Sequence, residues 1–91
     1  MSKQYIHISF NWSGKTKAKE LEPTFNSALD WIRYAPNCWI VWTSSDADKW
    51  FSRLKPHLGP QDNMLICQID PDDCQGWLEQ WVWDWLNKKR K

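Results

Sequence analysis

Residues 38–47 read Cys-Trp-Ile-Val-Trp-Thr-Ser-Ser-Asp-Ala, and this stretch decides the fold. Its first six residues form an almost continuous apolar run of β-forming side chains, which is typical of a central strand. Residues 44–46 are of the types that cap the start of a helix. The helix that follows carries an apolar stripe at helical spacing: Ala47, Trp50, Phe51 and Leu54. It is expected to end before Gly59-Pro60, a helix-terminating pair. The stretch therefore predicts a buried strand followed directly by an amphipathic helix.

The residues before this stretch add a helix and two strands. Residues 31–34 form a short strand candidate, and the turn at residues 35–37 joins it to the central strand as a hairpin. Residues 4–11 alternate in the manner of a strand with one apolar face. Residues 15–30 show helical periodicity, but Pro23 fits only in a first turn. We therefore expect the regular part of that helix to begin near residues 20–22.

The residues after the stretch add one strand and one helix. Residues 63–69 are a further strand candidate, and residues 70–73 (Asp-Pro-Asp-Asp) have the composition of a helix start. The final helix is expected to present one broad apolar face, made of Trp77, Leu78, Trp81, Val82, Trp85 and Leu86. The sheet face that the first two helices leave open is expected to be covered by this segment, by a second subunit or by both.

The predicted order is strand, helix, strand, strand, helix, strand and helix. It indicates an α+β fold: a ferredoxin-like βαββαβ sandwich with an appended tryptophan-rich C-terminal helix. We expect a single domain over residues 1–91, with its core at 4–70, the C-terminal helix at 71–88 and a basic tail at 88–91.

Tryptophan is unusually frequent, with nine copies in 91 residues. A core of this size cannot bury nine indoles, each with an N–H that needs a partner, so some must lie at a surface that marks an interface. The sequence therefore predicts a homodimer or another partner. The residues expected at the interface are Trp39, Trp42, Trp77, Trp81 and Trp85.

Charge is concentrated at the C-terminus, where Lys88, Lys89, Arg90 and Lys91 follow one another. Without them, eight basic residues face eleven acidic ones, which leaves the body at −3. A body of that sign is not suited to neutralising phosphates. The four tail residues stay candidates for nucleic-acid contact, and a frayed, solvated terminus is the alternative.

Cysteine usage and hydropathy indicate a cytoplasmic protein. Cys38, Cys67 and Cys74 are odd in number and have no zinc-type spacing, so we expect reduced thiols and no structural metal. The polar N-terminus has no signal-peptide core. The longest uncharged run, residues 34–45, is shorter than the about 20 residues that a bilayer-spanning helix needs. We predict no membrane association and no cofactor.

Taken with residues 5–11, 54–58 and 64–66, residues 38–47 resemble the SinR-like proteins, small chains related to the Cas-two adaptation subunit of CRISPR systems. A late Gly76-Trp77 and Trp85-Leu86 fit the same pattern. The resemblance implies a ferredoxin-like fold and a homodimer. For the wider family it also implies metal-dependent nuclease activity that uses an Asp at the end of the first strand. That position here is Asn11, a neutral amide without the negative charge on which a Mg²⁺ site relies.

Two functions follow as hypotheses. The first is a non-catalytic, homodimeric interaction module that binds a protein or nucleic-acid partner. The alternative is a Mg²⁺-dependent endoribonuclease or deoxyribonuclease, for which Asn11 and Asp70 are the candidate residues. Asp70 heads a carboxylate cluster with Asp72 and Asp73, and the same residue types also serve simply to begin a helix. We assign no metal ligand, and we favour the protein without catalysis.

Overall fold

The computed structural model describes residues 2–90. The strands are β1 (Gln4–Asn11), β2 (Asp30–Ala35), β3 (Cys38–Thr43) and β4 (Asn63–Ile69). The α-helices are α1 (Ala18–Phe25), α2 (Ala47–Leu54) and α3 (Gln80–Leu86). Two short 3-10 turns, η1 (Lys55–His57) and η2 (Pro71–Asp73), follow α2 and β4. The fold is therefore α+β.

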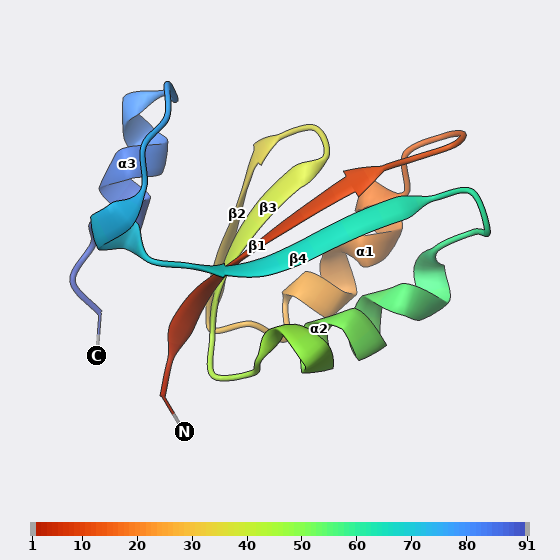
Figure 1. Ribbon diagram of the computed structural model, residues 1–91, viewed down its shortest axis with the longest axis horizontal. Helices are drawn as coiled ribbons and strands as arrows, with labels where there is room; N and C mark the ends of the chain where they lie inside the picture. Colours follow the sequence, from red (N-terminus) through yellow and green to blue (C-terminus); the bar gives the residue numbers. More distant parts are fainter. Residues whose placement is uncertain (1, 91) are drawn as a thin grey trace.

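The four strands form one antiparallel sheet in the order β2-β3-β1-β4. In the register, Ile8 of β1 lies between Trp39 of β3 and Ile66 of β4. Helices α1 and α2 lie together on one side of the sheet, whereas α3 lies apart from them, by the end at which β4 finishes (Figure 1). Because successive side chains of a strand point to opposite faces, this arrangement gives the sheet two separate apolar layers.

The main core lies between the sheet and the helices α1 and α2. Alternate residues of β1 and β3 point into it and meet the apolar stripes of both helices. Its buried members are Ile6, Ile8, Phe10, Ala18, Leu21, Phe25, Trp39, Val41, Trp50 and Leu54. The indole of Trp50 donates to the hydroxyl of Thr43 over 3.2 Å, so this buried N–H has a partner. Asp46 caps α2 by accepting from the backbone N–H of Lys49 at 2.9 Å, as the capping sequence predicts.

A second, smaller core lies on the opposite sheet face, under α3. Val82 and Leu86 of α3 are buried there against Tyr5 and Ile40. Half-buried side chains complete it: Ile32, Tyr34, Trp42, Ile69, Leu78, Trp83 and Trp85. Of the covers that the sequence leaves open for this face, the C-terminal helix is thus one that the single chain supplies itself.

Two helices differ from the sequence prediction. Helix α1 is only eight residues long, and Pro23 lies near its end, not in its first turn. Pro23 removes one helical donor, but both Pro23 and Lys19, whose carbonyl loses that bond, are exposed to water. The predicted C-terminal helix over 71–88 is also wrong in extent. Asp70 instead caps the start of the single turn η2. Residues 74–79 have no regular structure, and α3 begins at Gln80.

The Asp62 carboxylate joins the loop after β1 to the loop before β4. It accepts from the backbone N–H of Ser13 and of Gly59, both at 2.8 Å, and from the Ser13 hydroxyl at 3.0 Å. The Lys17 ammonium lies 3.3 Å away, and only 4% of the Asp62 side chain is exposed. The backbone hydrogen bonds from Ser13 and Gly59, above all, hold the pKa of Asp62 well below its usual range.

We expect Asp62→Asn to destabilise the protein at neutral pH and to have a smaller effect near pH 2. A carboxyl group whose pKa is lowered by folding adds stability that is fully present above its unfolded pKa of about 3.9. This stability declines below that value and is fully lost only when the pH falls below the lower pKa of the folded protein. Urea denaturation at both pH values measures the effect, with Glu22→Gln as an exposed control. An equal loss for Asp62→Asn at both pH values would contradict the account.

Candidate functional site

The tryptophans expected at an interface occupy three different environments. Trp39 is 1% exposed in the main core. Its ring stacks on Phe25 with centroids 4.9 Å apart and meets the edge of Phe10 at 5.3 Å. Trp39 therefore offers no surface to a partner, and its burial rules against the interface position predicted for it.

Trp42 and Trp85 hold α3 against the sheet. Both are half-buried and pack on Tyr5, whose ring centroid lies 4.7 Å from that of Trp42 and 5.5 Å from that of Trp85. They contact residues of the same chain. Their observed role is therefore to join β1, β3 and α3.

Trp77 and Trp81 point away from both cores. Trp77 lies in the irregular segment before α3 and is 99% exposed, and Trp81 on α3 is 46% exposed. The Trp81 indole N–H donates to the Glu79 carboxylate at 3.0 Å. The other large exposed apolar residues are dispersed: Leu29 lies in the loop before β2, Phe51 on α2 and Leu65 on β4. Trp77 and Trp81 are therefore two exposed indoles close together in the chain, and we call these two residues the outer tryptophan pair.

The two residues proposed for the nuclease alternative are not brought together. Asn11 pairs with Asn63 at one end of the β1–β4 ladder, and Asp70 follows Ile69, which pairs with Tyr5 at the other end. The Asp70 carboxylate accepts from the backbone N–H of Asp72 at 2.9 Å, which is the capping role. Within residues 2–90, no group of three or more His, Cys, Asp or Glu side chains is placed to hold a metal ion.

The basic tail turns back onto the protein. Arg90 is only 9% exposed, and its guanidinium pairs with the Asp30 carboxylate at 3.0 Å. It also donates to the Tyr5 hydroxyl at 2.7 Å and to the Trp85 carbonyl at 3.1 Å. Lys88 and Lys89 are exposed, and Lys91 lies outside the described residues. The tail is thus not a row of four solvated cations, because the Arg90 guanidinium is already paired with Asp30.

Four residues surround the Arg90 guanidinium: Tyr5, Asp30, Trp42 and Trp85. We call them the aromatic cage. The guanidinium carbon lies 4.5 Å from the ring centroid of Trp85, 5.6 Å from that of Tyr5 and 5.7 Å from that of Trp42. The Trp85 indole N–H donates to the same Asp30 oxygen at 2.9 Å. Partial burial alone would raise the pKa of Asp30, but the hydrogen bonds from Arg90, Trp85 and the Trp31 backbone outweigh it and lower the pKa.

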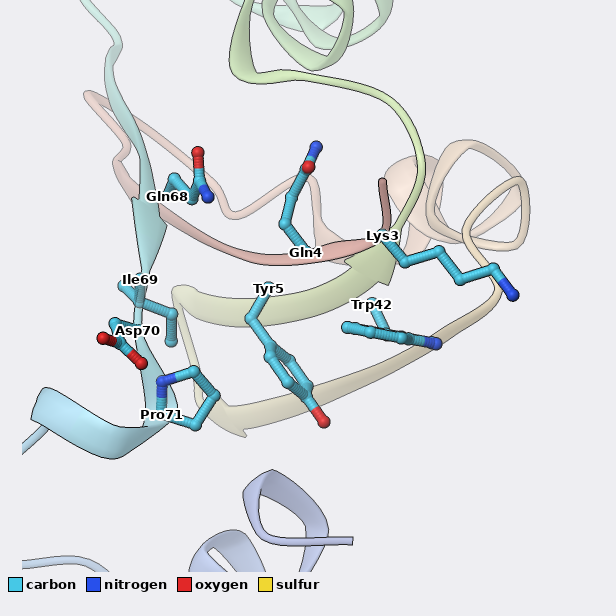
Figure 2. A pocket seen from close by; sticks show the side chains of 8 residues that line it. All are labelled: Lys3, Gln4, Tyr5, Trp42, Gln68, Ile69, Asp70 and Pro71. Atoms are coloured by element: carbon cyan, nitrogen blue, oxygen red, sulfur yellow. The ribbon is translucent and has the colours of Figure 1, made fainter. Parts of the chain in front are cut away.

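A hollow of about 600 Å³ lies beside the cage and shares Tyr5 and Trp42 with it. Its other lining residues come from the start of β1 and the end of β4: Lys3, Gln4, Gln68, Ile69, Asp70 and Pro71. Figure 2 shows the rings of Tyr5 and Trp42 side by side, with Asp70 and Pro71 beyond Tyr5 and Lys3 beyond Trp42. The hollow therefore has an aromatic wall, one carboxylate and one ammonium.

His7 and Tyr34 form a polar pair on the sheet face that carries α3. The His7 Nε2 atom lies 2.6 Å from the Tyr34 hydroxyl. Burial lowers the pKa of His7, and burial together with the neighbouring Cys38 thiol raises the pKa of Tyr34 to about 12. This hydrogen bond joins β1 to β2 across the intervening strand β3.

No family model matches the chain, and neither a curated protein nor a solved structure matches it. In the part of the chain from residue 2 to 90, no helix combines the length and the apolar character needed to cross a bilayer. The site must therefore be interpreted from its own geometry.

Proposed function

We propose that this protein is a non-catalytic interaction module that works as a homodimer, in a ferredoxin-like fold related to the SinR-like proteins. The alternation of elements and the antiparallel pairs β1–β3, β2–β3 and β1–β4 support the ferredoxin-like class. The SinR-like relationship is supported by the resemblance of residues 38–47. The free thiols Cys38, Cys67 and Cys74 are in keeping with the cytoplasmic location proposed here.

The observation that carries the proposal is the exposure of Trp77. An aromatic side chain buries about 150–250 Å² when it is covered. At about 25 cal/mol per Å² this corresponds to roughly 4–6 kcal/mol of gross transfer free energy. An indole that is 99% exposed leaves nearly all of that gain unused in the single chain. Because tryptophan is enriched among residues that dominate binding energy, the outer tryptophan pair is the surface we assign to the partner.

A second copy of the chain is the partner that we propose. In a two-fold dimer the same patch meets itself, so each outer tryptophan pair covers the other without a second specialised surface. The surrounding charges oppose a nucleic acid, because Glu79 and Asp84 flank Trp81 and are both acidic. Sites that stack single-stranded bases combine aromatic rings with a basic groove.

Sedimentation equilibrium of the wild-type chain and of single variants tests this proposal. We expect Trp77→Ser and Trp81→Ser each to weaken the dimer about tenfold or more, the effect of removing a residue worth at least about 1.4 kcal/mol. Phe51→Ser is the matched control, because Phe51 is exposed to the same 46% as Trp81 but lies on α2. Dissociation constants unchanged in both tryptophan variants would contradict the proposed interface.

A further inference from the structure

The aromatic cage has the chemistry of a binding site for a guanidinium group. Three rings, from Tyr5, Trp42 and Trp85, lie within 5.7 Å of the Arg90 guanidinium carbon. Three oxygen acceptors meet its N–H groups at 2.7–3.1 Å: the Tyr5 hydroxyl, the Asp30 carboxylate and the Trp85 carbonyl. Aromatic faces attract cations, and the three acceptors contact three different nitrogens of Arg90, Nε, Nη1 and Nη2, which a planar guanidinium holds at fixed positions. A lysine ammonium carries its three donors on a single nitrogen and cannot reproduce this arrangement.

The cage is held together by contacts that do not involve Arg90. The ring of Tyr5 packs on both Trp42 and Trp85. The Trp85 indole N–H fixes the Asp30 carboxylate across the gap between α3 and β2. Helix α3 is itself held by the burial of Val82 and Leu86 in the second core. The cage is therefore preorganised for its ligand, and removal of Arg90 leaves its walls supported.

The tail is attached much more lightly than the cage. Residues 87–89 are exposed, and the half-buried Arg90 follows at the end of this short segment. The hollow of about 600 Å³ begins at Tyr5 and Trp42, so there is room beside the cage for residues that flank an incoming arginine.

We propose that the aromatic cage is an arginine-binding site, which Arg90 fills within its own chain and which an arginine side chain of another polypeptide occupies when the tail leaves. The tail acts as a competitor. A group tethered by a short linker has an effective concentration of the order of millimolar, so Arg90 shields the cage from weak external ligands. This inference goes beyond the proposed homodimer and does not depend on the outer tryptophan pair.

The test is a calorimetric titration of the full-length Arg90→Ala chain with a capped peptide of the sequence of residues 87–91. We expect saturable binding that is about tenfold or more tighter to Arg90→Ala than to the wild type, because the internal competitor is gone. Two matched peptides carry lysine or citrulline in place of the arginine, and each is expected to bind at least about tenfold more weakly. Lys89→Ala, a change at an exposed neighbour, is expected to behave as the wild type.

Absence of binding to a folded Arg90→Ala chain, or equal binding of the lysine peptide, would overturn the proposal. A second measurement uses the wild-type chain, so that the test does not rest on the stability of the variant. The Arg90 Nε–H resonance, whose group donates to Tyr5 in the cage, should move toward that of a free arginine side chain with arginine peptide in excess of the tail's effective concentration, and not with the citrulline peptide. An unchanged resonance would also overturn the proposal. Neither result depends on the oligomeric state, so failure of the dimer leaves this test intact.

Discussion

Replacing Trp39 by alanine is expected to lower the free energy of unfolding by about 3–5 kcal/mol, the largest effect of any single indole truncation on the β3 strand. Trp39 is 1% exposed, stacks on Phe25 and meets Phe10 edge-on, so its removal leaves a cavity that these rings cannot close. Guanidinium denaturation followed by far-UV circular dichroism measures the loss.

Trp77→Ala is the matched control for this experiment, because the same residue type is removed from a position that is 99% exposed. At a protein concentration low enough to keep the chain monomeric, its effect on stability should stay within about 0.5 kcal/mol. A loss below about 1 kcal/mol for Trp39→Ala would show that the main core does not depend on this indole, contrary to the packing described.

Leu86→Asp is expected to detach α3 while leaving the main core folded. Leu86 is 5% exposed in the second core, and an unpaired carboxylate there costs several kcal/mol. The two cores lie on opposite faces of the sheet, so the damage should stay on the α3 side. Hydrogen exchange measures it: backbone amides of α3 should exchange about tenfold faster or more, and those of α2 should keep their protection.

Asn87→Asp is the control for Leu86→Asp. It adds the same charge at the next, exposed position, and the negative charge near the helix C-terminus should cost no more than about 1 kcal/mol. Equal loss of protection in α2 and α3 of the Leu86→Asp chain would mean that the two cores unfold as one unit, which the account excludes.

The strands were the most predictable part of the fold. The boundaries expected for the first, central and last strands, 4–11, 38–43 and 63–69, are those of β1, β3 and β4. Alternation and continuous apolar runs are strong local signals because each strand has at least one buried face. The helix after β3 was equally clear, since the capping residue Asp46 and the apolar stripe agree with each other.

The C-terminal segment was harder to predict. Trp77 and Trp81 have helical spacing, yet Trp77 lies outside α3. The single turn η2 after Asp70 does not continue into a helix, and α3 begins only at Gln80. Local periodicity cannot reveal such an interruption, and Gly76 was its one visible signal. Likewise, because side chains alternate along a strand, Trp39 and Trp42 must lie on opposite faces of β3, but nothing in the sequence identifies the face that α1 and α2 cover.

No pattern in the sequence indicated the aromatic cage. Asp30 and Arg90 lie sixty positions apart, and neither belongs to a motif. They come into contact only because α3 packs against β1 and β3. The number and order of charges in the sequence do not reveal this tertiary contact. The sequence therefore indicated a basic tail that is either solvated or in contact with a nucleic acid, whereas in the structure Arg90 is half-buried and paired with Asp30.

Light scattering coupled to size exclusion, over a range of micromolar concentrations, is the most direct test of the central claim that the outer tryptophan pair joins two copies of the chain. We expect a mass that approaches twice the 11.0 kDa of a single chain as concentration rises. A mass that stays at 11.0 kDa at every concentration would contradict it.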